Sequence, residues 1–187
     1  MRRHSFWAII AAGMAGCAHP AFARADQAVA AGSAQAEVVR PLLVTRERDL
    51  AFGGLFAGNL PGRVTVTAQA QTIYEGGVAA ACAVDDCTRP HPASFLVSGE
   101  PGRSYQVSVP TAVEANGHLI GAGGGVAAAL RVEGLTTDTL SRPGSGGNGR
   151  LSETGQDRFT IGGTLRIPAR LPAASYRARI PVIVTYG

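Results

Sequence analysis

The residue types best suited to chemistry gather in one short stretch, between positions 82 and 91. Cys82 and Cys87 enclose four residues, among them Asp85 and Asp86, and His91 follows. Tetrahedral zinc needs four ligands and favours cysteine pairs separated by two residues, which this spacing does not provide. A redox pair would require C-x-x-C. We therefore predict that Cys82 and Cys87 form a disulfide in an oxidising compartment, with zinc binding and free thiols as the alternatives.

Motifs for catalysis are otherwise missing from the sequence. It contains no G-x-S-x-G nucleophile elbow, no H-E-x-x-H zinc helix and no lysine. Beyond residue 23 the histidines are His91 and His118, both expected in loops or turns. Residues 123–128 fit G-x-G-x-x-A, but that fingerprint requires repeated βαβ units, which the sequence does not predict. We predict that the protein is not an enzyme and uses no cofactor or metal; a hydrolase built on loops is the alternative.

The N-terminus has the three parts of a secretory signal peptide. A basic start is followed by an apolar run over residues 5–18, and Ala21 and Ala23 then supply small residues at the −3 and −1 positions. The run is too short for a stable membrane anchor. We predict a signal peptide over residues 1–23, with Ala25 as a second cleavage site, and export to the periplasm, the cell surface or the medium. The alternative is lipidation of Cys17, which ends a lipoprotein-like Met-Ala-Gly-Cys box and would attach the protein to a membrane.

The charge of the mature chain argues against nucleic acid as a partner. Loss of Arg2 and Arg3 with the leader leaves 15 arginines against 13 acidic residues. These arginines are dispersed from Arg24 to Arg179, whereas a nucleic-acid surface needs clustered positive charge. Beyond the leader no apolar stretch is long enough to span a bilayer, so no membrane contact is expected unless Cys17 is lipidated.

Hydrophobic residues alternate with polar ones along most of the mature chain. Residues 24–36 are polar and alanine-rich and are expected to form a flexible N-terminal arm. From Glu37 onward, runs such as 38–44, 64–70, 159–167 and 176–186 have a period of two, and turns are frequent among 25 glycines and 11 prolines. We predict an all-β domain over residues 37–187, an antiparallel immunoglobulin-like sandwich of about eight to ten strands.

Three local features of this domain are expected from the pattern. Gly99–Gly102 contains Pro-Gly between two alternating runs, which predicts a hairpin. Gly162 and Gly163 interrupt an apolar row and suggest a bulge or bend. The last run is expected to be one long strand whose inward face carries Tyr176, Ala178, Ile180, Val182, Val184 and Tyr186.

Several stretches in a fixed order resemble a bacterial family of exported proteins known as domain of unknown function 4402 (DUF4402). The matching stretches are Val39–Val44, Asp49–Gly53, Gly62–Val66, Pro92–Gly102, Phe159–Leu165 with Pro168 and Ala169, and Ala173–Tyr176 leading into Val182–Tyr186. The resemblance spans residues 37–187. The family has no assigned activity, and it generally lacks the Cys82 and Cys87 pair.

The layout is also similar to the spore coat U and archaic chaperone–usher pilin subunits, through Leu50, Phe52, Gly53 and the near-final Tyr186. That resemblance implies an incomplete sandwich, which a neighbouring subunit completes by adding a strand. The expected function is therefore a non-enzymatic, fimbria-like or cell-surface subunit, with other copies or pilin-like subunits as partners. The alternative is an exported module that binds a carbohydrate or surface ligand through loops 81–91 and 142–149.

Overall fold

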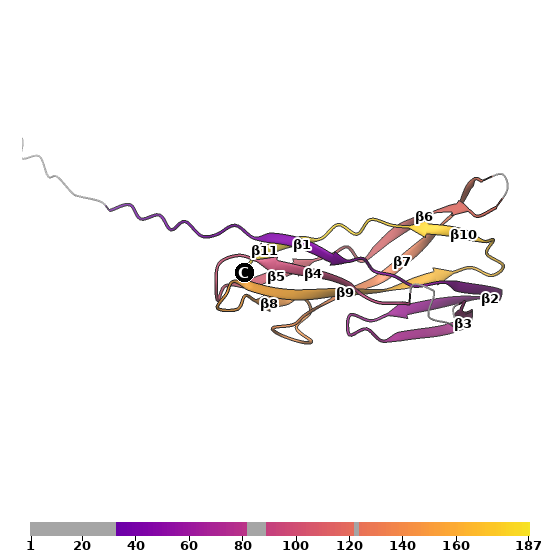
Figure 1. Ribbon diagram of the computed structural model, residues 1–187, viewed down its shortest axis with the longest axis horizontal. Coiled ribbons are helices and arrows are strands. Elements are labelled where there is room, and N and C mark those ends of the chain that lie inside the picture. Colours follow the sequence, from indigo (N-terminus) through magenta and orange to yellow (C-terminus); the bar gives the residue numbers. More distant parts are fainter. Residues whose placement is uncertain (1–32, 82–88, 122–123) are drawn as a thin grey trace, which may run out of the picture. The chain divides into compact units, whose positions relative to one another are not determined.

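The domain is built from antiparallel β-strands, as the computed structural model in Figure 1 shows. The structure describes residues 33–81, 89–121 and 124–187, and it contains no helix in these ranges. The chain divides into two units, residues 1–37 and 38–187. The strands of the second unit are β1 (Leu43–Arg48), β2 (Leu55–Val66), β3 (Thr72–Ala80), β4 (Ala93–Ser98), β5 (Ser104–Ser108), β6 (Ala112–Leu119), β7 (Val126–Thr139), β8 (Asn148–Arg150), β9 (Gln156–Ile167), β10 (Ala174–Arg177) and β11 (Ile183–Tyr186).

Two sheets share one hydrophobic core. The larger sheet has the order β1-β4-β9-β7-β6-β10, and β2 joins β9 and pairs with β3. The smaller sheet has the order β11-β5-β8. The larger sheet curls on itself as half a barrel, so its concave face surrounds much of the core (Figure 1). The predicted all-β, antiparallel class is therefore confirmed.

Strand β9 lies at the centre because its inward row is almost continuously apolar. Phe159, Ile161, Leu165 and Ile167 are buried, and Phe159 stacks on Phe95 of β4 with ring centroids 5.0 Å apart. One edge of β9 pairs first with β4 and then with β2, while β7 follows its other edge. Burial on this scale is the main force holding the larger sheet together.

The predicted bulge is present, but on the neighbouring strand. Between Glu133 and Thr136 strand β7 advances three positions while β9 advances two, from Thr164 to Gly162. Gly162 is instead required by close packing, because a Cβ atom there would lie 2.5 Å from both the amide nitrogen of Ala68 and the carbonyl oxygen of Val66. The glycine pair therefore marks where the chain at residues 66–68 crosses β9.

The hairpin predicted at Gly99–Gly102 is wrong. This turn links β4 of the larger sheet to β5 of the smaller sheet, and the two strands do not pair with each other. Val97 and Tyr105 are both buried, because the chain crosses from one side of the core to the other. The turn residues were identified correctly, but a tight turn does not determine whether its flanking strands remain in one sheet.

The C-terminal strand is also divided between the sheets. β10 pairs with β6 in the larger sheet, and β11 pairs with β5 in the smaller one. From Arg177 to Ile183 the C-terminal segment advances six positions. Its partner residues on β6 and β5 run over eight positions, from Asn116 to Ser108. The register slip allows one extended segment to follow β5 and β6 around the bend between the sheets. The predicted face is nevertheless correct for Tyr176, Ile180, Val182, Val184 and Tyr186, which pack on the core, whereas Ala178 is exposed.

Candidate interaction site at an open edge

The last two strands and the first one leave an edge of the domain unpaired. Among the described residues, β11 has β5 as its one strand neighbour, β10 has β6 and β1 has β4. Each of these strands therefore presents a row of backbone N–H and C=O groups that no described strand uses. Such edges are the surfaces through which sheets accept further strands.

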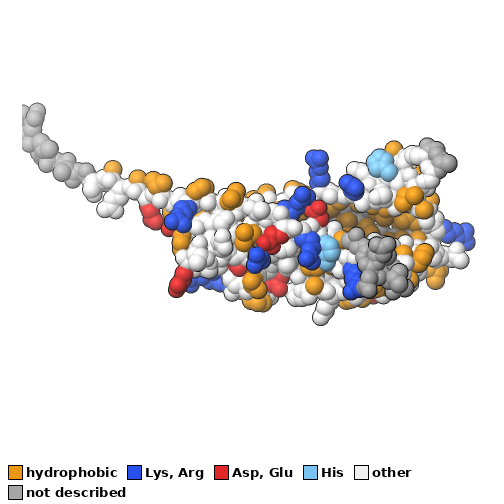
Figure 2. Space-filling view, viewed as in Figure 1, with side chains coloured by type: hydrophobic (Ala, Val, Ile, Leu, Met, Phe, Trp, Pro, Cys, Tyr) orange, Lys and Arg blue, Asp and Glu red, His pale blue; other side chains and the backbone are white. Residues whose placement is uncertain are grey.

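Half-buried hydrophobic side chains from the N-terminal and C-terminal parts of the domain pack against the core. They touch the core but are not fully covered by it. The N-terminal set is Leu42, Leu50, Phe52, Leu55 and Ala57, and the C-terminal set is Leu171, Tyr176, Ile180, Val182, Val184 and Tyr186. In the space-filling view, hydrophobic side chains line a hollow between the positions of β10 and β2 (Figure 2). We refer to the strip between β1 and the β10–β11 segment as the edge groove.

Tyr186 closes one end of the edge groove. Its hydroxyl donates a hydrogen bond to the carbonyl oxygen of Arg40 (2.6 Å) and accepts one from the amide of Glu100 (2.7 Å). The Glu100 carboxylate in turn accepts the Arg40 amide proton at 3.1 Å. Gly99 lies directly under the hydroxyl, where a Cβ atom would collide with it. The C-terminal strand is thus joined to the segment that enters β1.

The other end of the edge groove is formed around Tyr176. Its ring lies against Gly117 of β6, and a Cβ atom on Gly117 would collide with the ring and with Ala127. The Tyr176 hydroxyl is buried and has no hydrogen-bond partner among the described residues. A buried hydroxyl without a partner is costly, so this end has an unused capacity for hydrogen bonding.

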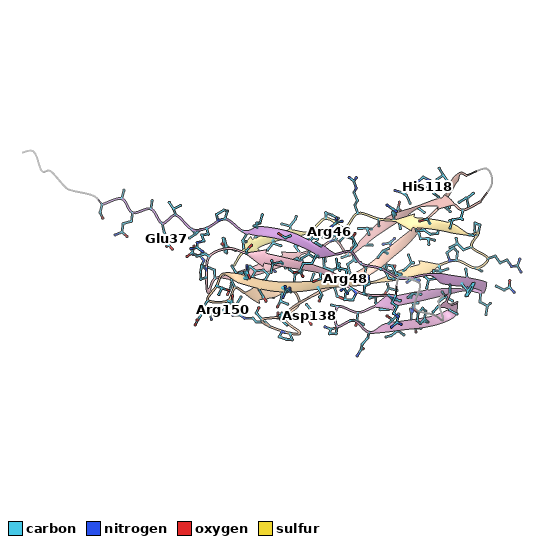
Figure 3. The ribbon with its side chains drawn as sticks, in the orientation of Figure 1. Glu37, Arg46, Arg48, His118, Asp138 and Arg150 are labelled. Carbon is cyan, nitrogen blue, oxygen red and sulfur yellow. The ribbon has the colours of Figure 1, made fainter. Side chains whose placement is uncertain are left out.

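Strand β1 carries three charged residues in succession, Arg46, Glu47 and Arg48, and Figure 3 labels the two arginines. Arg46 pairs with Asp49, both exposed. Glu47 accepts hydrogen bonds from the Ser94 hydroxyl (2.9 Å) and from the Arg158 guanidinium (3.0 Å). These contacts tie β1 to β4 and β9 across the outside of the sheet. Hydrogen bonding from Ser94, and then from Arg158, lowers the pKa of Glu47 below its ordinary value.

The lowered pKa of Glu47 predicts a loss of stability in acid. A depressed carboxyl pKa contributes stability above the unfolded-state value, near 4.5, and this contribution disappears as the pH falls through the folded-state pKa. Glu47→Gln is expected to flatten the decrease in melting temperature below pH 4.5. Glu153→Gln, at an exposed turn, is the control. Identical acid profiles for Glu47→Gln and wild type would contradict the assignment.

The residues predicted to do chemistry are not brought together in the described structure. Cys17, Ala21, Ala23, Cys82 and Cys87 all lie outside the described residues, so the cleavage, lipidation and disulfide predictions stay predictions. His91 is half-buried and forms a bridge with Ala51. His118 is exposed on strand β6 rather than in a turn. Across residues 33–81, 89–121 and 124–187 no three His, Cys, Asp or Glu side chains gather as a metal site would require.

Loop 142–149, predicted as a ligand loop, borders an open pocket of roughly 450 Å³. Its lining includes Gly144 and Gly146 of the loop, the apolar residues Val107, Val109 and Leu135, and the polar residues Gln69 and Asp138. Gln69 and the Gly144 amide both donate to the Asp138 carboxylate, at 2.8 Å each. The Asp138 carboxylate is therefore already engaged by hydrogen bonds, one of which comes from the loop itself.

Sequence reasoning missed a buried carboxylate, Asp157, which links the two sheets. It accepts hydrogen bonds from the Tyr105 hydroxyl of β5 (2.8 Å), from the Ser141 hydroxyl and from the Arg158 amide (2.8 Å). The alternation of β9 could have identified it, because Asp157 lies on the same inward-facing row as the buried Phe159 and Ile161. The arrangement includes no histidine or metal ligand, and its evident effect is to join β5 to β9.

The geometry defines a class of protein: an antiparallel β-domain of two sheets in which β1, β10 and β11 each have one unpaired edge among the described strands. The profile of the family described as "Domain of unknown function (DUF4402)" matches residues 42–186, from the segment entering β1 to the last residue of β11. The chain belongs to this family, as its sequence indicated. No match was found among curated proteins or among solved structures. In the described ranges no helix is long and apolar enough to cross a bilayer.

Proposed function

We propose that this protein is a non-enzymatic, exported structural subunit, of a cell-surface or fimbria-like kind, that assembles with other copies or similar subunits by strand addition. The observation that carries the proposal is the unpaired outer edge of β11 beside an incompletely covered row of core side chains. Export rests on the predicted signal peptide, which lies outside the described residues.

The strand order supports reading the domain as an immunoglobulin-like sandwich that lacks its last strand. Such sandwiches place strands A-B-E-D in one sheet and G-F-C in the other. Here β1-β4-β9-β7 follow the order A-B-E-D, and β11-β5 follow F-C. Among the described residues no strand occupies the position of strand G, because β11 pairs with β5 and with no other described strand. An added strand at that position would hydrogen-bond to β11 and cover the edge groove.

The free backbone groups of β11 can be assigned to particular residues. The Gly187 amide donates to the Ser104 carbonyl at 3.0 Å, on the β5 side. Because alternate residues of an antiparallel strand face the same neighbour, Thr185 and Ile183 also face β5. The N–H and C=O groups of Val184 and Tyr186 therefore face the open edge.

This assignment provides a test in which the variant is expected to remain folded. Val184→Pro removes an N–H at the open edge while keeping an apolar side chain, and proline is tolerated where a strand faces solvent. We expect the mature wild-type protein to form oligomers in size exclusion with light scattering, and the proline variant to fold but stay monomeric. Val184→Ala, which keeps the N–H, should still assemble.

Two results would contradict the proposal. One is a wild-type protein that stays monomeric at every concentration. The other is a folded Val184→Pro variant that assembles as well as wild type, which would place the interface elsewhere. Circular dichroism and thermal unfolding establish that the variants are folded.

A further inference from the structure

The pocket beside loop 142–149 lies where strand β7 has a free edge. Strand β6 begins at Ala112, opposite Glu133 of β7, whereas β9 accompanies β7 as far as Thr139. Over residues 135–139, one edge of β7 therefore has no strand neighbour among the described residues. We infer that the pocket along this edge binds a neutral sugar ring of the pyranose type. The inference goes beyond strand addition, because none of the residues lining the pocket belongs to β1, β10 or β11.

The free edge of β7 supplies backbone groups that a ligand can use. The Leu140 amide donates to the Arg158 carbonyl of β9 at 2.8 Å. Because alternate residues of an antiparallel strand face the same neighbour, Asp138 and Thr136 also direct their backbone groups toward β9. Thr137, which lines the pocket, therefore directs its N–H and C=O groups away from β9, where no described strand pairs with them. One donor and one acceptor are thus available to a hydroxyl-bearing ligand.

The Asp138 carboxylate, labelled in Figure 3, has capacity for one further hydrogen bond. Its Oδ1 atom accepts from the amides of Thr139 (3.1 Å) and Gly144 (2.8 Å), and its Oδ2 atom accepts from the Gln69 side chain (2.8 Å). A carboxylate has about four lone-pair sites, so one site on Oδ2 remains. A hydrogen bond from a ligand hydroxyl to a carboxylate is stronger than one between neutral groups.

The groups that surround Asp138 are fixed before a ligand arrives. Ala70, next to Gln69, adopts the left-handed backbone conformation, with φ at 65°. This conformation is costly for a residue other than glycine, and it persists only where the surrounding structure imposes it. In the loop, the Asn148 side-chain amide donates to the Ser145 carbonyl at 2.8 Å. A site held in this way loses less conformational entropy when it binds a small ligand.

The remaining lining residues match the two kinds of surface on a sugar ring. Val107, Val109 and Leu135 provide aliphatic contacts for its C–H groups, and exposed Ser108 and Thr136 add hydroxyls for its polar groups. The volume, roughly 450 Å³, lies within the usual range of small-molecule sites. The described lining holds one carboxylate and neither a basic nor an aromatic side chain, which disfavours anions and flat aromatic ligands. A neutral pyranose is the ligand class that uses both surfaces.

Saturation-transfer difference NMR on the mature full chain tests this site. The probes are the methyl pyranosides of glucose, galactose and mannose. We expect saturation transfer to the ring protons of at least one of them, and no transfer from any of the three would overturn the inference. Retardation in gels that contain dextran or mannan then distinguishes recognition of a sugar within a polysaccharide from recognition of the free sugar.

Three substitutions locate the binding. Thr136→Val removes an exposed hydroxyl and is expected to raise the Kd about 3- to 10-fold, and Asp138→Asn about 10-fold or more. Asp49→Asn, which removes an exposed carboxylate paired with Arg46, is the matched control and should bind like wild type. Thermal unfolding establishes that each variant is folded, and Thr136→Val keeps the test valid if Asp138→Asn disturbs the loop. Unchanged binding by the folded pocket variants would overturn the assignment.

Sugar binding and assembly are measured separately. Val184→Pro lies outside the pocket and should abolish assembly while leaving the Kd for the methyl pyranoside unchanged. If a folded Val184→Pro variant lost sugar binding, the site would require assembly, and the pocket of the single chain would be overturned. If wild type stayed monomeric but bound the sugar, the proposed function would fail and this inference would stand.

Discussion

Gly162→Ala is expected to destabilise the domain by about 3 kcal/mol or more, the upper end of what overpacking costs. The new Cβ atom would lie 2.5 Å from the Ala68 nitrogen and the Val66 oxygen, and 2.6 Å from the Thr67 carbonyl carbon. All three are backbone atoms, so no side-chain rotation relieves the contact. The chain at residues 66–68 would have to leave β9, taking with it the hydrogen bond from the Thr160 hydroxyl to the Ala68 carbonyl (2.9 Å).

The neighbouring glycine provides a matched control. At Gly163 a Cβ atom would meet the Leu135 Cδ2 atom at 2.8 Å, and this atom is the end of a flexible side chain. Gly163→Ala is therefore expected to cost about 1 kcal/mol. Urea denaturation of both variants measures the difference. A Gly162→Ala variant as stable as Gly163→Ala would show that residues 66–68 do not pack on β9 as described.

The faces of the strands were predictable from the sequence, whereas the sheet to which each strand belongs was not. Alternation identified Val64 and Val66 as inward-facing, and both are fully buried. It also identified the inward row of the last strands, because a period of two is a local property of the chain. Pairing depends on contacts between distant residues. The link between β4 and β5, and the division of the last strand into β10 and β11, therefore appeared only in three dimensions.

The edge position of the first strand is another local property that the sequence carries. Pro41 precedes this strand, and proline is typical of a sheet edge because it lacks the N–H that a central strand donates. Strand β1, which begins just after Pro41, pairs only with β4 among the described strands.

Tyr105→Phe is expected to lower the free energy of unfolding by about 1–3 kcal/mol at pH 7, the range for a lost hydrogen bond to a charged group. Tyr105 is 1% exposed, and its hydroxyl donates to the buried Asp157 carboxylate. Phenylalanine fills the same space but leaves Asp157 with one donor fewer. The phenol therefore stabilises the contact between β5 and β9 by hydrogen bonding rather than by volume.

The pH dependence separates this role from simple packing. Burial, and then the hydrogen bond and negative charge of Asp157, raise the pKa of Tyr105 far above its ordinary value of 10.0. A raised pKa means that the stabilisation is fully present below the unfolded-state pKa and is lost as the pH rises from about 10 toward the folded-state pKa. Wild type should therefore lose stability above pH 10 faster than Tyr105→Phe, and the difference between their free energies of unfolding should decrease. Tyr74→Phe controls for ionisation of the other tyrosines. If this difference stays constant from pH 7 to 11, the Tyr105 hydroxyl does not keep its proton above pH 10 in the folded protein.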